Sequence, residues 1–84
     1  MHQRDYITLL LFGWVREAAG ANHIEIQNMH GRSVRELRLH LIKQLQLGDE
    51  INHCMVAINH KYALEDTLLN SSDEIALIPP VSGG

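Results

Sequence analysis

The sequence predicts an α+β fold in which a β-sheet packs on one main helix and a short helix follows the first strand. The prediction rests on short apolar segments bounded by turn residues, on one amphipathic segment with a helix-start signal, and on the order in which these segments alternate. A chain of 84 residues has room for one hydrophobic core. We therefore expect one domain over residues 1–78 and an extended tail over residues 79–84.

The first two strands and the short helix are expected within residues 6–27. Residues 6–12 (YITLLLF) are rich in strand formers and too few for a typical helix. Residues 14–19 have the composition of a short helix, and Gly20 is a typical helix end. Residues 23–27 alternate polar and apolar with a period of two, as a half-buried strand does.

The main helix is expected to begin after Ser33 and to run to about Leu45. Ser33 and Glu36 have the spacing of a capping box, in which both side chains satisfy free backbone N–H groups. Apolar residues then recur at spacings of three and four, which is typical of one buried helix face. The residues expected on this face are Val34, Leu37, Leu41 and Leu45.

The remaining strands are expected in the second half of the chain. Residues 54–59 predict a third strand and residues 61–63 a short fourth one. A connecting turn over residues 64–69 and a polar loop follow, and residues 73–78 predict the last strand. Pro79 and Pro80 end it, because proline cannot donate a hydrogen bond to a neighbouring strand.

The first and last strands carry more apolar residues than one helix layer can cover. Ile7, Leu9 and Leu11 alternate with Leu10 and Phe12, and the last strand repeats this pattern. One outcome is an uncovered apolar patch near the tail, including Phe12 and Ile78, of the kind that marks a protein partner. The alternative is that loops and the short helix bury these side chains.

The ending Gly83-Gly84 is the strongest functional signal. Two residues without side chains fit a narrow channel, and the preceding prolines stiffen the tail. The reactive group there is the α-carboxylate of Gly84, which is ionised at neutral pH. The tail therefore predicts a carboxylate activated by a separate enzyme. The alternative is an inert end with nothing to hold it.

The composition of the chain argues against binding of nucleic acid, a membrane or a metal ion. A net charge of −3 gives no reason to expect nucleic acid or a membrane as a partner, and the single Cys54 is typical of a reducing cytoplasm. The histidines lack metal-ligand spacing, and we expect no metal site.

No nucleotide-binding motif or catalytic set of side chains is present in the sequence. We interpret Arg32, Arg35 and Arg38 as a solvated face, with a docking surface for an acidic partner as the alternative. Cys54 is expected in the core, and so is Trp14, with a protein interface as the alternative for Trp14.

Two segments resemble a known family. Residues 12–20 (FGWVREAAG) are similar to its "F-A-x-x-R-E-x-x-G" motif, with Gly13 in place of the usual alanine. Residues 73–84 (DEIALIPPVSGG) are similar to its "D-E-V-A-x-x-P-P-V-[ST]-G-G" ending. The family is the sulfur-carrier subunit of molybdopterin synthase. The resemblance covers essentially the whole chain and implies a β-grasp, ubiquitin-like fold with a mixed sheet.

The resemblance implies a non-catalytic role in which Gly84 carries sulfur. An adenylating enzyme would use ATP and magnesium to activate the Gly84 carboxylate, and a sulfur donor would convert it to a thiocarboxylate. The tail would then enter the large synthase subunit and deliver sulfur to cyclic pyranopterin monophosphate, with no cofactor bound stably by this chain. The tail residues are Pro79, Pro80, Val81, Ser82 and Gly83.

The family pattern also implies a docking surface formed by Phe12, Arg16, Tyr62 and Ile78. In this family two small subunits flank a dimer of large ones. Three alternatives share the expected fold: a thiamine-pathway sulfur carrier, a ubiquitin-like protein modifier, and an interaction domain with an inert tail. The nature of the bond formed by Gly84 would distinguish them.

Overall fold

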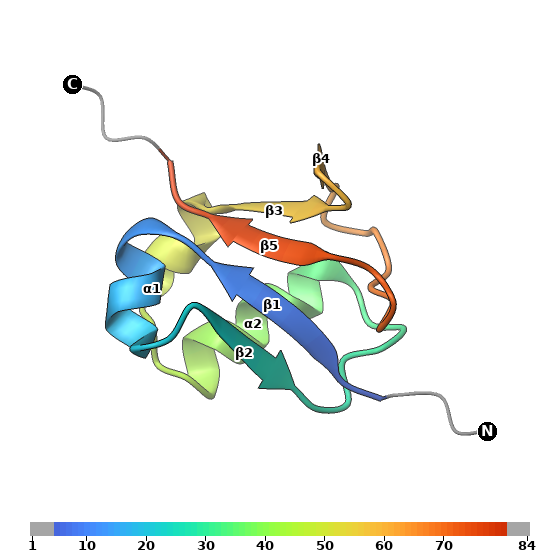
Figure 1. The fold of residues 1–84 in the computed structure, drawn as a ribbon, viewed down its shortest axis with the longest axis horizontal. Coiled ribbons are helices and arrows are strands. Elements are labelled where there is room, and N and C mark those ends of the chain that lie inside the picture. Colours follow the sequence, from blue (N-terminus) through green and yellow to red (C-terminus); the bar gives the residue numbers. More distant parts are fainter. Residues whose placement is uncertain (1–4, 81–84) are drawn as a thin grey trace.

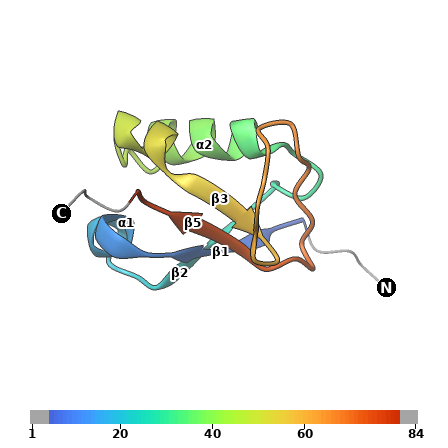
Figure 2. The same ribbon diagram turned by 90° about the horizontal axis from the view of Figure 1, so that it is seen from above.

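A computed structural model describes residues 5–80 and contains a mixed, five-stranded sheet covered on one face by a helix (Figures 1 and 2). The strand order is β2-β1-β5-β3-β4, with β1 and β5 parallel and the other neighbours antiparallel. The strands are β1 (Ile7–Leu11), β2 (His23–Ile26), β3 (Met55–Ile58), β4 (Lys61–Tyr62) and β5 (Ile75–Ile78). The helices are α1 (Gly13–Ala19), α2 (Val34–Lys43) and a 3-10 helix, η1 (Asp49–His53). The predicted fold class is confirmed.

The core lies between α2 and the inner face of the sheet. Ile7, Leu9 and Leu11 alternate along β1 and are almost completely buried, as the period of two predicts. Leu9 pairs with Ile75 and Leu11 with Leu77 in the parallel ladder, so the two central strands bury matching positions. The inner face therefore supplies the hydrophobic stabilisation of the fold.

Helix α1 lies at one end of the sheet (Figure 2). Val15 is its buried residue and joins the core cluster. Gly20 ends the helix in the left-handed conformation, with φ of 71°, and its N–H donates to the carbonyl of Arg16 at 2.9 Å. The predicted end of this helix is confirmed. The core placement of Trp14, which was favoured over an interface, was wrong, because the residue is 36% exposed.

Helix α2 begins with the predicted capping box. The Glu36 N–H donates to Ser33 Oγ at 3.2 Å, and the Ser33 N–H donates to Glu36 Oε1 at 3.0 Å. The hydrogen bond from the Ser33 N–H, together with those from Arg32 and from the Ser33 hydroxyl, holds the pKa of the Glu36 carboxyl below its usual range. The box stabilises the first turn, as the spacing in the sequence predicted.

The other end of α2 differs from the prediction. The helix stops at Lys43, and Leu45 is 41% exposed instead of buried. Gln46 adopts a left-handed φ of 54°, and the N–H of Leu47 turns back to the carbonyl of Leu41 at 3.3 Å. This reversal, usually made by glycine, packs Leu47 against the core in place of Leu45.

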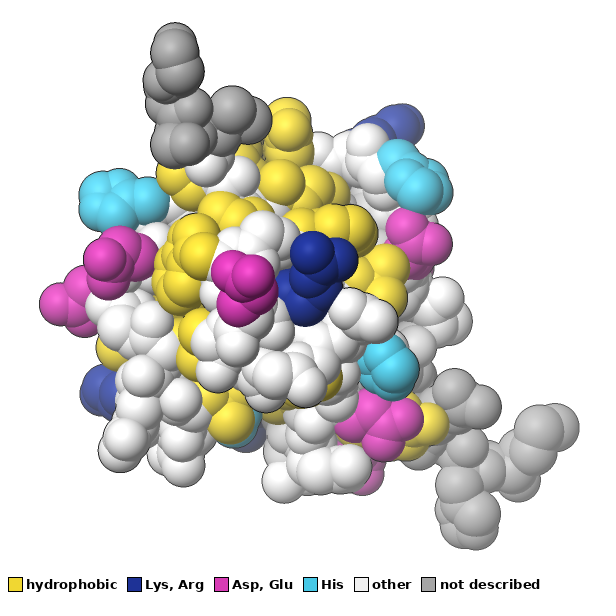
Figure 3. Space-filling model, turned by 60° about the vertical axis from the view of Figure 1, so that its left-hand side comes forward, with side chains coloured by type: hydrophobic (Ala, Val, Ile, Leu, Met, Phe, Trp, Pro, Cys, Tyr) yellow, Lys and Arg dark blue, Asp and Glu magenta, His cyan; other side chains and the backbone are white. Residues whose placement is uncertain are grey.

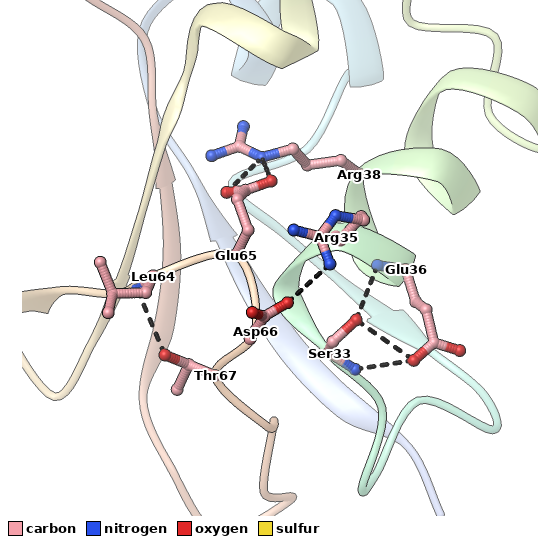
Figure 4. A network of polar contacts seen from close by, with 8 residues as sticks. All are labelled: Ser33, Arg35, Glu36, Arg38, Leu64, Glu65, Asp66 and Thr67. Atoms are coloured by element: carbon pink, nitrogen blue, oxygen red, sulfur yellow. Dashed lines mark hydrogen bonds and ion pairs between the residues drawn. The ribbon is translucent and has the colours of Figure 1, made fainter.

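Arg38 joins three segments that are distant in the chain, and its assignment to a solvated face was wrong. The residue is 8% exposed. Its Nη1 donates to the carbonyls of Ile51 and Cys54, at 2.8 and 2.6 Å. Its Nε donates to the Glu65 carboxylate at 2.9 Å (Figure 4). Arg38 thus ties α2 to η1, a helix that the sequence did not predict, and to the loop before β5.

The loop over residues 64–69 also caps the start of α2. The N–H groups of Val34 and Arg35 donate to the carbonyls of Thr67 and Glu65, both at 3.0 Å. An exposed ion pair joins Arg35 to Asp66 at 2.6 Å (Figure 4). Because the first N–H groups of a helix lack partners within it, these contacts complete the helix start.

No helix within residues 5–80 is both long enough and apolar enough to cross a bilayer.

We expect Arg38→Met to lower the free energy of unfolding by about 2–3 kcal/mol, measured by urea denaturation. Methionine retains the apolar stem but leaves two buried carbonyls without their donor. Arg35→Met is the matched control one turn away, and its exposed ion pair predicts a much smaller loss. Equal losses in the two variants would contradict the role assigned to Arg38.

Candidate functional site

A hollow of about 390 Å³ lies on the outer face of the sheet, away from α2. Its walls come from four strands, from the residue that links β1 to α1, and from one residue each in the β3–β4 turn and just before β5. Apolar side chains dominate the lining, with one acidic and one imidazole group among them. The lining residues are Leu10, Phe12, Ala57, His60, Tyr62, Glu74, Ala76 and Ile78.

The strand register explains why the sheet is hollowed there. Leu10 pairs with Ala76, Ala76 with Ala57, and Ala57 with Tyr62. Paired residues of neighbouring strands point to the same face, so these four form one row across the sheet. Two alanines in the middle, between leucine and tyrosine at the ends, leave a depression bordered by larger side chains.

Large apolar side chains remain exposed around this hollow. Phe12 is 45% exposed and Tyr62 is 67% exposed. Met55, opposite Ile78 in the antiparallel ladder, extends the apolar face along β3 and is also exposed. Of the two outcomes that the sequence left open, the apolar patch is therefore the one present, and α1 does not cover it. Figure 3, which turns α1 forward, shows hydrophobic side chains in a broad patch around a few charged ones.

The polar side of the hollow is made by the turn between β3 and β4. Asn59 and His60, both with positive φ, form a two-residue hairpin connection. The Glu74 N–H donates to Asn59 Oδ1 at 3.0 Å, which fixes the turn against the start of β5. His60 Nε2 lies 3.5 Å from Glu74 Oε2. This pair gives the otherwise apolar hollow one polar edge.

The structure brings together three of the four predicted docking residues. Phe12, Tyr62 and Ile78 all line the hollow, whereas Arg16 is exposed on α1 and is not part of its lining. Their role in docking stays a prediction. Ala57 was not predicted as part of this site, because its place on the outer face follows from the strand register. The other lining residues that were not assigned to docking are Leu10, Ala76, His60 and Glu74. The signal that could have found Leu10, Ala57 and Ala76 is their outward position on the strands.

The first residues of the predicted tail follow β5 directly. Ile78 ends the strand, Pro79 is partly buried, and Pro80 is exposed. Because Ile78 also lines the hollow, the tail of residues 79–84, from here on the C-terminal arm, starts at the border of the apolar face. The other predicted tail residues and the proposed reactive group lie outside the described residues: Val81, Ser82, Gly83 and Gly84.

Within residues 5–80, the side chains that could bind a metal are dispersed, and the cysteine that could act as a nucleophile is buried. Within residues 5–80, no group of three histidine, cysteine or acidic residues is placed to hold a metal ion. Cys54 is 1% exposed, as expected for a core residue. Burial raises the pKa of its thiol, and the positive charge of Arg38 opposes this effect only in part.

The chain was compared with known proteins. Residues 9–84 match the model of the ThiS family. A molybdopterin synthase sulfur carrier subunit of Dictyostelium discoideum is 36% identical over 83 aligned positions, with 90% of this chain and 93% of the relative covered. The corresponding subunit of Mycobacterium tuberculosis is 36% identical over 86 aligned positions, with 93% of this chain and 96% of the relative covered.

Two kinds of solved structure share the fold. Small archaeal modifier protein 1 from Methanosarcina acetivorans has a TM-score of 0.70 and 28% identity, with 100% of both chains covered. A chain in the complex of subunits 1 and 2 of the molybdopterin-converting factor from Helicobacter pylori has a TM-score of 0.64 and 26% identity, covering 94% of this chain and 99% of that one.

We expect the Cys54 thiol of the folded protein to react with a disulfide reagent on the order of 100-fold more slowly than after unfolding. The side chain is buried and its raised pKa disfavours the reactive thiolate. The measurement is the absorbance of the released thiol at pH 8, with and without denaturant. Labelling of the folded protein at the rate of a free thiol would contradict the burial of Cys54.

Proposed function

This chain belongs to the ThiS family, and we propose that it is a sulfur carrier in molybdenum cofactor biosynthesis, acting as the small subunit of a molybdopterin synthase. One observation carries the proposal beyond family membership. Ile78 lines the apolar hollow and is also the last residue of β5, from which the Gly-Gly tail continues. A partner that covers the outer face of the sheet would receive the tail at the same interface.

The hollow has the chemistry of a protein docking site. Its apolar lining and the exposed aromatic rings of Phe12 and Tyr62 would lose water on contact with a matching surface. Aromatic side chains are frequent anchors in such interfaces. In our proposal this face binds the large synthase subunit and, at another stage, the adenylating enzyme.

The reaction at Gly84 begins with activation. A carboxylate oxygen attacks the α-phosphorus of ATP, pyrophosphate leaves, and a mixed anhydride with AMP forms. Sulfide from the donor attacks the carbonyl carbon, and the C–O bond to AMP breaks with its electron pair. The product is a thiocarboxylate on Gly84. The adenylating enzyme supplies ATP, magnesium and the catalytic groups.

Sulfur delivery occurs in the large subunit. The thiocarboxylate sulfur is a better nucleophile than a carboxylate oxygen. It attacks a carbon of cyclic pyranopterin monophosphate, and a C–O bond at that carbon breaks with its electron pair. Water then attacks the thioester carbonyl of Gly84 and breaks its C–S bond, which leaves the sulfur on the pterin and returns Gly84 to a carboxylate. Two deliveries supply the two sulfurs of the molybdopterin dithiolene. This chain provides sulfur and docking, and the partner provides catalysis.

A second candidate is covalent modification of other proteins. The similarity to small archaeal modifier protein 1 favours it. The activated Gly84 carbonyl would then be attacked by a lysine amine in place of sulfide, giving an isopeptide bond. The two functions share the activation step and differ in the nucleophile that displaces AMP.

We expect Tyr62→Ala to weaken binding to the large synthase subunit about 10-fold or more, measured by calorimetry. The ring lies at one end of the hollow and would be buried by the partner. Leu64→Ala is a matched control, because Leu64 is 79% exposed and lies outside the hollow. Equal effects of the two substitutions would argue against docking at this face.

We expect incubation with ATP, magnesium, the adenylating enzyme of the same organism and sulfide to replace one oxygen of Gly84 by sulfur. Intact mass spectrometry measures the corresponding increase. A chain lacking Gly84 is the control and should keep its original mass.

The acceptor then separates the alternatives. Transfer of the sulfur to cyclic pyranopterin monophosphate by the large subunit supports the carrier of molybdopterin synthesis. Isopeptide-linked Gly84 on lysines would support the modifier. A thiocarboxylate that the large subunit never consumes would favour the thiamine-pathway carrier. An unchanged mass, with the adenylating enzyme active on another carrier, would overturn the proposal.

A further inference from the structure

The start of α1 and the start of the C-terminal arm lie against each other. The parallel ladder pairs Leu9 with Ile75 and Leu11 with Leu77. Continued two residues beyond its end, this register places Gly13 opposite Pro79. The ribbon views agree, since the start of α1 lies beside the end of β5 in both (Figures 1 and 2).

Gly13 leaves no room for a side chain at this contact. A Cβ atom built on Gly13 would lie 2.8 Å from Cγ of Pro79 and 3.6 Å from its Cδ. The first distance is shorter than carbon atoms tolerate. The ring of Pro79 is closed on its own backbone, so it cannot swing aside as a flexible side chain would. A larger residue at position 13 must therefore move either the helix start or the arm.

We propose that Gly13 and Pro79 form a positioning contact that sets the direction in which the C-terminal arm leaves the sheet. The inference rests on the proposed function, in which Gly84 must reach two different active sites. Proline restricts φ, so a fixed Pro79 followed by Pro80 limits the directions in which the chain can leave the sheet. The Gly13–Pro79 contact fixes that first step at the border of the hollow.

The backbone conformation of Gly13 does not by itself account for the contact. Gly20, at the other end of α1, also has a positive φ, 71° against 59° at Gly13. A Cβ at Gly20 would meet nothing within 4 Å. The two glycines thus share the conformational requirement, and only Gly13 has the close approach. This difference gives a matched control within one helix.

The test begins with the contact itself. In the wild-type protein we expect a nuclear Overhauser effect between the Hα protons of Gly13 and the ring protons of Pro79. We expect Gly20→Ala to lower Tm by roughly 4–8 °C, the effect of a positive φ alone in a domain of this size. Gly13→Ala should lower it further, and Pro79→Ala should relieve that extra loss in the double variant.

Alanine at position 13 is informative for a second reason. It is the residue usual in the motif that residues 12–20 resemble, and restoring a usual residue is commonly neutral or stabilising. The geometry predicts the opposite here. A Tm for Gly13→Ala equal to or above that of Gly20→Ala, or no relief in the double variant with Pro79→Ala, would overturn the contact.

The second part measures what the contact does. We load wild type, Gly13→Ala and Gly20→Ala with sulfur and follow transfer by the large subunit, well below the Tm of every variant. A misdirected arm should lower kcat by about 10- to 100-fold, because reacting groups must be closely aligned. KM should stay near the wild-type value, because the lining of the hollow is unchanged. Gly20→Ala should retain both constants.

The outcomes separate this inference from the function on which it rests. A confirmed contact with wild-type kcat in Gly13→Ala would overturn the positioning role. A parallel rise in KM would assign the contact to docking and also overturn it. If the wild-type chain is never loaded, the proposed function and with it the positioning role are wrong, while the NMR and Tm measurements still decide the contact.

Discussion

The parallel pairing of β1 with β5 is the constraint on which the rest of the structure depends. These strands form the centre of the sheet, and each of their inward residues belongs to the core. The same register sets the outward residues, so Leu10 lies beside Ala76 at the hollow. It also carries the chain from β5 to the position opposite Gly13. The core, the proposed docking face and the origin of the C-terminal arm all follow from this one alignment.

The inner face of the sheet stabilises the fold, and the outer face carries the proposed docking site. The inner face packs on α2, and Arg38 holds that helix to η1 and to the loop before β5 through buried polar contacts. The outer face contributes a row with small residues at its centre. Phe12 and Tyr62, on the outer face, are exposed and do not belong to the core cluster.

Local patterns in the sequence predicted local structure well. The capping box of Ser33 and Glu36 and the helix end at Gly20 were predicted because each depends on residues a few positions apart. Leu45 was misassigned because Gln46, a residue that gives no turn signal, reverses the chain. Arg38 was misassigned because its partners, Ile51, Cys54 and Glu65, are distant in sequence.

The site was predictable to the extent that it follows from alternation. An uncovered face with Phe12 and Ile78 was one of two outcomes left open by the sequence, because both strands carry apolar residues on both faces. The contribution of Ala57 required the register between β3 and its neighbours, which no single segment contains. The same holds for the closeness of Gly13 and Pro79, since it depends on pairing strands from opposite ends of the domain.

That central pairing also has a consequence for biosynthesis. Leu9 and Ile75 come from near the two ends of the described chain, so their ladder closes a loop that contains almost the entire domain. During translation the middle of the sheet stays open until β5 has left the ribosome. A chain truncated before β5 would leave one backbone edge of β1 without its parallel partner. The pairing of β5 therefore completes the sheet and, in the same step, places the residues that lead into the tail.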